Sequence, residues 1–426
     1  MTAARPAIRV WLALLLSTIV AAAASAQTIA LTGARVFPVS QPPIDNATIL
    51  IAGGKITAVG ANVPIPSSAE RIDAAGTWIT PGLIDPVTVL GVVEIGAVPQ
   101  ANDASAKGDK SVAAAFRVWD ALNPASMLWA PTRNEGVTTV GVVPAGGLIA
   151  GQAAVVDLVD GTRNDMIRRK PAAVVAQLQS GVSPDTASRG EVLLRLRELL
   201  QDAKAYAAHR QAYETARTRT LATTRPNLDA LVPVVRGQLP LMLSVDRAAD
   251  IDAALDLARE LALKLVLVGA EEGWMVAGRI AAARVPVITG ALDNIPGSFA
   301  TLGARQENAA LLRQAGVDVA LSSGGESFNV RNLKQHAGNA VAYGLSWDDA
   351  LRAVTMTAAD ILGVAGSVGT LQPGRDANLV VWDGDPFEFQ TQVVRVIVHG
   401  REIKQQSRQD LLMERYKSAP PVYIGR

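Results

Sequence analysis

Cysteine is absent from this chain of 426 residues, and histidine occurs only three times. The absence of cysteine excludes disulfide bonds, thiolate metal sites and cysteine nucleophiles. Aromatic residues make up 4% of the chain and the formal net charge is +1, so the composition gives no electrostatic case for binding nucleic acid or an anionic membrane surface. Hydrophobic residues make up 49%, enough for a large core, and the length favours two domains.

The N-terminal residues have the organisation of a secretory signal peptide. Arg5 and Arg9 precede an apolar run, and Ala24-Ser25-Ala26 fits a small-residue cleavage site. We expect cleavage after Ala26 and export to the periplasm or the medium, with no membrane attachment of the mature chain. The alternative is an uncleaved anchor helix, which the alanine-rich second half of the run disfavours.

Short strands and turns are expected at both ends of the chain. Residues 29–36, 47–51 and 56–59 alternate apolar and polar side chains, with a tight turn between the last two. Residues 377–382 and 393–398 are expected to form strands near the C-terminus. Because so small an N-terminal sheet cannot stand alone, it needs a partner, and the C-terminal strands can supply one.

Between these ends, strands alternate with helical patterns, which is typical of parallel βα units. Seven strands can be placed and an eighth cannot, so a closed (β/α)8 barrel and an open doubly wound sheet both fit the pattern. Residues 186–218 predict a charged helical excursion, and residues 408–416 a terminal helix. The placed strands are the one that follows Pro81 and those at 136–143, 152–158, 239–245, 264–269, 285–289 and 317–322.

Three motifs carry a family resemblance. The sequence PGLID at residues 81–85 resembles the entry to the first barrel strand of the amidohydrolase superfamily. Residues 369–386 (GTLQPGRDANLVVWDGDP) and 394–403 (VRVIVHGREI) resemble that family's closing segment. The glycine-rich loop at 146–152 (GGLIAGQ) resembles one in the imidazolonepropionase-like branch of the superfamily.

The resemblance implies a (β/α)8 barrel with a small composite β-sandwich built from both chain ends. It divides residues 27–404 into the N-terminal part of the sandwich (27–80), the barrel (81–365, with the excursion at 186–218) and the C-terminal part of the sandwich (366–404). The signal peptide (1–26) precedes them, and a helix and tail (405–426) follow. The resemblance also implies hydrolysis of C–N bonds other than peptide bonds, with one or two divalent metals such as zinc as cofactors.

The positions at which the resemblance places metal ligands carry residues of other kinds. Valine and glycine side chains have no donor atom, and serine is not among the usual ligands of a catalytic zinc ion. We therefore expect no metal centre and no catalytic residue. The family's His-x-His pair falls on Val87 and Val89, its later histidines on Ser244 and Gly269, and its catalytic aspartate on the Ser322-Ser323-Gly324 stretch.

The histidines of this chain, His209, His336 and His399, lie away from the expected ends of the barrel strands, which leaves an oxygen-only site for Mg²⁺ or Ca²⁺ as the remaining way to hold a metal. The carboxylates at or near the expected strand ends are Asp85, Asp246, Glu271, Glu272 and Glu326. The plainer alternative is that Asp85 makes a structural hydrogen bond and that the others cap helices or face solvent. A glycine loop, likewise, more often simply turns the chain. Our candidates for ligand binding at the barrel mouth are Asp85, Gln152, Asp246, Arg247, Glu271 and Glu326.

Two functions remain open. The first is a degenerate family member without a metal centre, which binds a small molecule or a partner; the partner is another copy in a homodimer or an intact relative. The second is an active hydrolase of cyclic amides or small peptides with an unconventional metal site. A purely structural scaffold differs from the first only in having no ligand.

Overall fold

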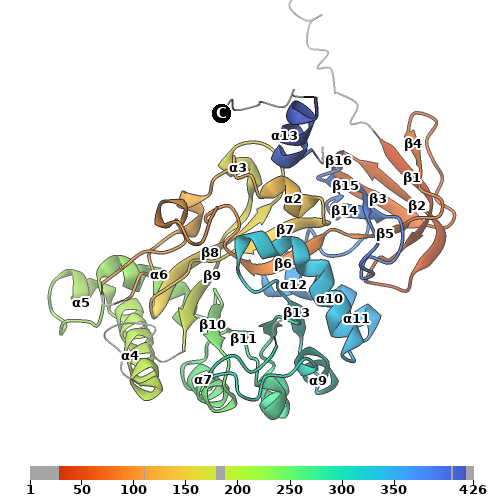
Figure 1. Ribbon diagram of the computed structural model, residues 1–426. Coiled ribbons are helices and arrows are strands. Elements are labelled where there is room, and N and C mark those ends of the chain that lie inside the picture. Colours follow the sequence, from red (N-terminus) through yellow and green to blue (C-terminus); the bar gives the residue numbers. More distant parts are fainter. Residues whose placement is uncertain (1–27, 110, 179–187, 293, 404–405, 419–426) are drawn as a thin grey trace, which may run out of the picture.

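The computed structural model describes residues 28–109, 111–178, 188–292, 294–403 and 406–418. These residues form two eight-stranded β-sheets, the second of which is surrounded by helices (Figure 1). The expected signal peptide lies outside the described residues. Over the ranges that are described, no helix combines the length and the hydropathy that crossing a bilayer requires.

The first sheet joins the two ends of the chain, as expected for the composite β-sandwich. Figure 1 shows the first strands, in red and orange, beside the last ones, in blue. Its strand order is β16-β15-β14-β5-β1-β2-β3, with β4 paired to β1. Its strands are β1 (Ile29–Val36), β2 (Ile44–Ala52), β3 (Lys55–Gly60), β4 (Glu70–Asp73), β5 (Trp78–Pro81), β14 (Leu379–Trp382), β15 (Val393–Val398) and β16 (Arg401–Glu402).

The second sheet is a nearly closed barrel, which confirms the predicted fold class. Its strands follow one another in chain order from β6 to β13. The ends of β6 and β13, the first and last strands, meet at a parallel bridge between Thr88 and Gly325. There the Val89 N–H donates to the Gly325 carbonyl over 3.0 Å. The strands are β6 (Leu83–Thr88), β7 (Val137–Val142), β8 (Ile149–Asp157), β9 (Ile167–Gln177), β10 (Leu241–Val245), β11 (Leu265–Gly269), β12 (Val287–Thr289) and β13 (Val319–Leu321).

The strand that the sequence could not place is β9, and its neighbour β8 runs in the opposite direction to the rest. β8 pairs antiparallel with both β7 and β9. The segments on either side of it, residues 143–148 and 158–166, are too short for the crossover that a parallel connection needs. The barrel therefore departs from a strict βα repeat at this one strand.

Helices cover the outside of the barrel. The predicted excursion is part of this layer: α4 is capped by Ser188, which accepts from the Glu191 N–H, and it buries Leu196, Leu199 and Tyr206 in the main core. The α-helices are α2 (Trp129–Arg133), α3 (Arg163–Met166), α4 (Arg189–Ala208), α5 (Arg210–Glu214), α6 (Arg225–Val235), α7 (Ala248–Leu261), α8 (Ala277–Ala283), α9 (Asn308–Gln314), α10 (Leu333–Ala342), α11 (Trp347–Ala353), α12 (Met356–Ile361) and α13 (Arg408–Tyr416). The 3₁₀ helices are η1 (Pro99–Ala101), η2 (Val118–Ala121), η3 (Gly273–Val276) and η4 (Ser327–Asn332).

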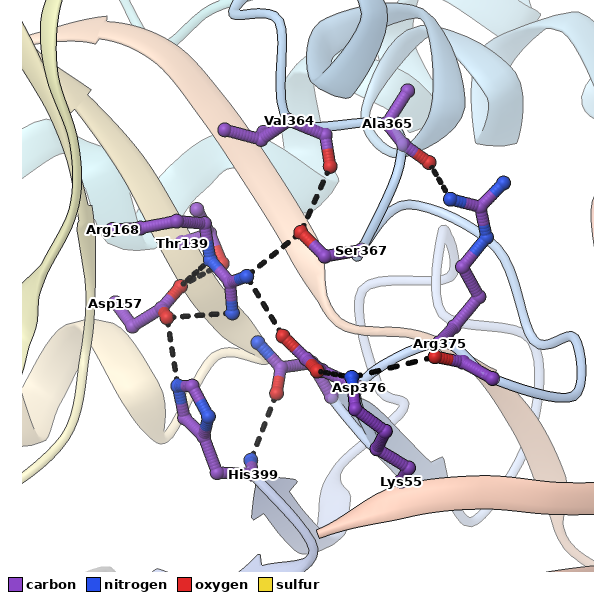
Figure 2. A network of polar contacts seen from close by, with 12 residues as sticks. Lys55, Thr139, Asp157, Arg168, Val364, Ala365, Ser367, Arg375, Asp376 and His399 are labelled. Atoms are coloured by element: carbon purple, nitrogen blue, oxygen red, sulfur yellow. Dashed lines mark hydrogen bonds and ion pairs between the residues drawn. The ribbon is translucent and has the colours of Figure 1, made fainter.

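A network of charged side chains joins the N-terminal face of the barrel to the sandwich (Figure 2). Arg168, near the start of β9, lies 2.7 Å from a carboxylate oxygen of Asp157 at the end of β8 and 2.7 Å from one of Asp376. From the sandwich side, His399 Nε2 lies 2.8 Å from Asp157, and Lys55 Nζ lies 2.7 Å from Asp376. Arg168 and Asp157 are almost fully buried, and Arg168 is the main counter-charge of Asp157, whereas Arg168 itself is compensated by both Asp157 and Asp376.

We expect Arg168→Met to lower the free energy of unfolding by about 3–5 kcal/mol, because it leaves the buried Asp157 carboxylate without its main counter-charge. Urea unfolding followed by circular dichroism measures this loss. The control is Arg395→Met, which breaks an exposed ion pair with Glu402 in the same sheet as Lys55 and should cost less than about 1 kcal/mol. Equal losses for the two variants would contradict this role of Arg168.

Candidate functional site at the barrel mouth

A cavity of about 500 Å³ opens at the C-terminal ends of the barrel strands. This is the face on which barrel enzymes of this type carry their active sites. Most of the wall is apolar, and the polar side chains are few. The cavity is lined by Val87, Val89, Val93, Gly96, Asn102, Ala104, Ser105, Val143, Pro144, Ala145, Gly146, Val175, Gln177, Met242, Ser244, Val268, Gly324, Gly325 and Glu326.

Four of the five positions named for metal ligands contribute to the cavity wall, one of them through Gly324 of the Ser322-Ser323-Gly324 stretch. Val87 and Val89 line it from β6 and the turn after it, with Ser244 of β10 in the same wall. The two valines present methyl groups to the space that a metal would occupy. Neither offers a lone pair, so this part of the wall does not fit a divalent ion.

Asp85, in β6, is fully buried and turned toward the last barrel strand. Ser323, which follows β13, donates to its carboxylate from the hydroxyl over 2.5 Å and from the backbone N–H over 3.1 Å. The Ser322 hydroxyl lies 2.8 Å from the same carboxylate, and the Val87 N–H donates to it over 3.2 Å. Burial raises the pKa of Asp85 above its ordinary value of 3.8, outweighing the hydrogen bonds from Ser323 and Ser322. We call this arrangement the Asp85 clamp.

At the end of β11 the carboxylate of Asp246 fills the space where a side chain at position 269 would begin. A Cβ built on Gly269 would lie 2.2 Å from Asp246 Oδ1. Gly269 also has a φ of +86°, a backbone conformation that disfavours any other residue. A histidine at this position would therefore have to displace the Asp246 side chain and adopt a strained left-handed backbone conformation.

The remaining candidates are spread around the mouth rather than gathered in it. Of our six, only Glu326 lines the cavity, and it is exposed at the rim. The Gln152 amide donates to the Ala114 carbonyl over 3.1 Å, and Arg247 pairs with Asp250 over 2.7 Å at the start of α7. Glu271, which follows β11, is not among the residues that line the cavity, whereas its neighbour Glu272 accepts from the N–H groups of Ala248 and Gly303.

The three histidines lie outside the cavity wall. His209 is exposed between α4 and α5, and His399 belongs to the polar network at the opposite end of the barrel. His336 is buried in α10, where its Nδ1 accepts from the Ala291 N–H over 3.1 Å. The described ranges contain no group of three or more histidine, aspartate or glutamate side chains placed to hold a metal ion. The donor set at the mouth therefore does not fit the divalent metal of the family.

Three polar residues of the cavity wall, Asn102, Ser105 and Gln177, were not among the candidates from the sequence. Gln177, at the end of β9, directs its side chain into the wall beside Ser244. It was missed because β9 was the strand that could not be placed. A polar residue that closes an otherwise apolar run (AAVVAQ, 172–177) was the signal that could have revealed it.

Comparison with known proteins gives one consistent result. A model of the amidohydrolase family matches residues 279–403. The imidazolonepropionase of Acidiphilium cryptum (strain JF-5) is 26% identical over 369 residues, covering 81% of this chain and 89% of that protein. The imidazolonepropionase of Maricaulis maris (strain MCS10) is 25% identical over 84% of this chain and 92% of its own length. The crystal structure of an amidohydrolase from Thermotoga maritima MSB8 matches with a TM-score of 0.81 and 26% identity, covering 89% of this chain and all of that one.

The barrel and the sheet built from both chain ends together define a class, the barrel hydrolases with a composite β-sandwich. Within that class, the chain belongs to the amidohydrolase superfamily, in its imidazolonepropionase-like branch. These relatives carry the names of enzymes. Whether this chain has an activity depends on the residues at its own barrel mouth.

We expect Asp85→Asn to change how stability depends on pH. Because the folded pKa of Asp85 lies above 3.8, the folded chain keeps a proton that the unfolded chain has released, so the native protein loses stability as pH rises from about 3.8 through the folded pKa. The variant lacks this loss, and its stability relative to the native protein should rise across that window by up to about 1.4 kcal/mol per pH unit.

Urea unfolding at a series of pH values checks this expectation. Asp376→Asn serves as a control, because the pKa of the native Asp376 is shifted in the opposite direction. Burial acts to raise this pKa, but hydrogen bonds from Lys55 and Arg168 outweigh burial and lower it. The native contribution of Asp376 is therefore present above 3.8 and lost as pH falls through the folded pKa. Parallel curves for Asp85→Asn and the native protein would rule out the clamp as described.

Gly269→Ala should lower the free energy of unfolding by at least about 1–2 kcal/mol, the cost of a left-handed backbone for a residue with a Cβ. The overlap with Asp246 adds to this cost, so the penalty should be smaller in an Asp246→Ala background. Gly278→Ala is the matched control, because its Cβ meets open space within α8, and it should be neutral or stabilising. An unchanged penalty in the double variant would show that Asp246 does not restrict position 269.

Proposed function

We propose that this chain is a degenerate amidohydrolase that no longer holds a metal and instead binds a small molecule in the barrel mouth. The observation that supports this most is Val87 and Val89 lining a cavity of about 500 Å³ where the family's metal-binding histidines belong. In the Ser322-Ser323-Gly324 stretch, where the resemblance places the catalytic aspartate, both serine hydroxyls are engaged with Asp85. Among the described residues, the wall of the mouth carries no histidine and its one carboxylate, Glu326, is exposed at the rim, so it lacks the usual ligands of a metal ion that would activate water.

The retained cavity supports binding rather than a purely structural role. Pockets of this size, mostly apolar and with a few polar side chains, are typical of small-molecule sites. We further propose that the protein is exported, on the strength of the N-terminal signal pattern. Pairing with another copy or with an intact relative is also part of the proposal, and co-purification from cells that express such a relative tests it.

The second candidate is a hydrolase of cyclic amides or small peptides with an oxygen-ligand metal site. It is favoured by the similarity to proteins named imidazolonepropionase, which extends over four-fifths of this chain or more. The oxygen ligands would come from Asp246, Glu271 and Glu326, only the last of which lines the cavity.

Metal content separates the two candidates. The purified protein is incubated with Zn²⁺, Mn²⁺ or Mg²⁺, desalted and analysed by mass spectrometry for bound metal. We expect background retention of every ion, because the mouth presents valine methyl groups in place of imidazoles. Near-stoichiometric retention that Asp246→Ala, Glu271→Ala or Glu326→Ala abolishes would overturn the proposal and support the hydrolase; an exposed-site variant, Asp256→Ala, is the control for non-specific binding.

A further inference from the structure

A second cavity, of about 540 Å³, lies at the opposite end of the barrel from the mouth, where the strands begin. Three of the side chains that line it are cationic: Arg169 in β9, Lys264 directly before β11, and Arg284 before β12. Lys264 and Arg284 are exposed, and Arg169 is half-buried. The buried residues of the lining are all apolar, so the cavity combines an apolar interior with a cationic rim.

None of these three cations meets a carboxylate in the part of the chain that the structure describes. The Arg169 guanidinium donates to the Gly363 carbonyl over 2.5 Å, and the side chains of Lys264 and Arg284 have no partner among the described residues. Elsewhere on the surface, arginines are commonly paired with acids. Cations that share a cavity without a counter-ion repel one another, and a bound anion would relieve that repulsion.

The single acid of the lining, Asp360, does not balance these charges. Partial burial and the neighbouring Asp318 raise the pKa of this carboxyl, and Arg375, which lies outside the lining, acts against them. Even with Asp360 ionised, three positive charges and one negative charge leave the lining with a net charge of +2. The cavity is therefore complementary in charge to a dianion.

Arg169 is held in position at this rim. A Cβ built on Gly363 would overlap the Arg169 guanidinium, so this side chain rests directly on the glycine backbone. The bond to the Gly363 carbonyl uses one of the five N–H donors of the guanidinium. The remaining donors form a planar fork that suits the oxygens of a phosphate group.

We propose that this cavity binds an organic phosphate, a phosphate monoester with an apolar body, whose phosphate lies among Arg169, Lys264 and Arg284. A phosphate monoester carries nearly two negative charges at neutral pH and offers three acceptor oxygens, which matches the charge and the donors of the rim. The apolar body packs against the buried residues of the lining. The volume lies within the range of small-molecule pockets. The site is separate from the mouth, so it stands whether or not the mouth binds a ligand.

Calorimetry at low ionic strength and about pH 8 tests the ligand class, with 2-naphthyl phosphate, 2-naphthoate, 2-naphthol and inorganic phosphate as the compounds. We expect 2-naphthyl phosphate to bind at least about fivefold more tightly than the singly charged 2-naphthoate. It should also bind at least about tenfold more tightly than 2-naphthol, which lacks the charge, or inorganic phosphate, which lacks the apolar body. Absence of heat from 2-naphthyl phosphate, or equal binding of 2-naphthoate, would overturn the proposal.

Variants locate the site. Lys264→Gln and Arg284→Gln should each weaken binding of 2-naphthyl phosphate at least about threefold without changing thermal unfolding, because both side chains are exposed and lack partners among the described residues. Arg71→Gln removes an exposed arginine from β4 in the other sheet and should leave binding unchanged. Equal losses in all three variants would reduce the effect to the overall charge of the protein and overturn the site.

Val87→Phe separates this site from the mouth. It fills the mouth cavity and should leave the affinity for 2-naphthyl phosphate unchanged. Loss of binding in this variant, with native thermal unfolding, would place the compound in the mouth and overturn the assignment.

Phosphate monoesters occur as soluble molecules and as the headgroup of phosphatidate, and vesicle flotation distinguishes the two sources. Vesicles of phosphatidylcholine with phosphatidate are compared with vesicles of phosphatidylcholine alone. Flotation that requires phosphatidate and is lost in Lys264→Gln would identify a lipid headgroup as the ligand. Binding of 2-naphthyl phosphate without flotation would identify a soluble phosphate, and absence of both would overturn the site.

Discussion

The buried carboxylate of Asp85 is the interaction on which the closed barrel most depends. The ladder of the barrel sheet runs from β6 to β13 without a named pairing between these two strands. Asp85 spans that gap by accepting hydrogen bonds from Ser322 and Ser323. A carboxylate in so apolar a place is costly, and the shift of its pKa expresses that cost. The clamp stabilises the barrel only because its donors are held in position by the backbone of the adjoining strands.

The clamp and the mouth cavity are consequences of the same local geometry. Asp85 faces the place where β6 and β13 meet, whereas Val87 and Val89, which follow it, face the cavity. Ser322, drawn toward Asp85, leaves the cavity wall to its neighbours Gly324 and Gly325. The mouth is therefore lined by aliphatic side chains and glycines on this side, whereas the polar side chains that line it elsewhere are Asn102, Ser105, Gln177, Ser244 and Glu326.

Much of the fold could be predicted from the sequence, because apolar runs and turns mark β6, β7 and β10 to β13 clearly. Strand β9 could not be predicted, since it opens with charged residues such as Arg168 that are needed for contacts far away in the chain. The direction of β8 could not be predicted either, because an apolar run has the same pattern in a parallel strand as in an antiparallel one. At the site, Asp85 was recognised as either a ligand or a structural group, but its partner Ser322 lies 237 positions away. Contacts between residues so far apart in the sequence are set by the whole fold and cannot be predicted from the local sequence.

The sheet that joins the two chain ends has a consequence for how this protein comes into being. Trp382 in β14 donates from its indole to Thr80 in β5, across 302 positions of sequence, and β14 pairs antiparallel with the edge of β5 that the N-terminal strands leave open. During synthesis this edge of β5 must wait for nearly the entire polypeptide before its partner strand exists. Contacts of such long range slow folding and leave strand edges open to aggregation in the meantime. A chain of this design benefits from a chaperone that shields its first strands until the last have emerged.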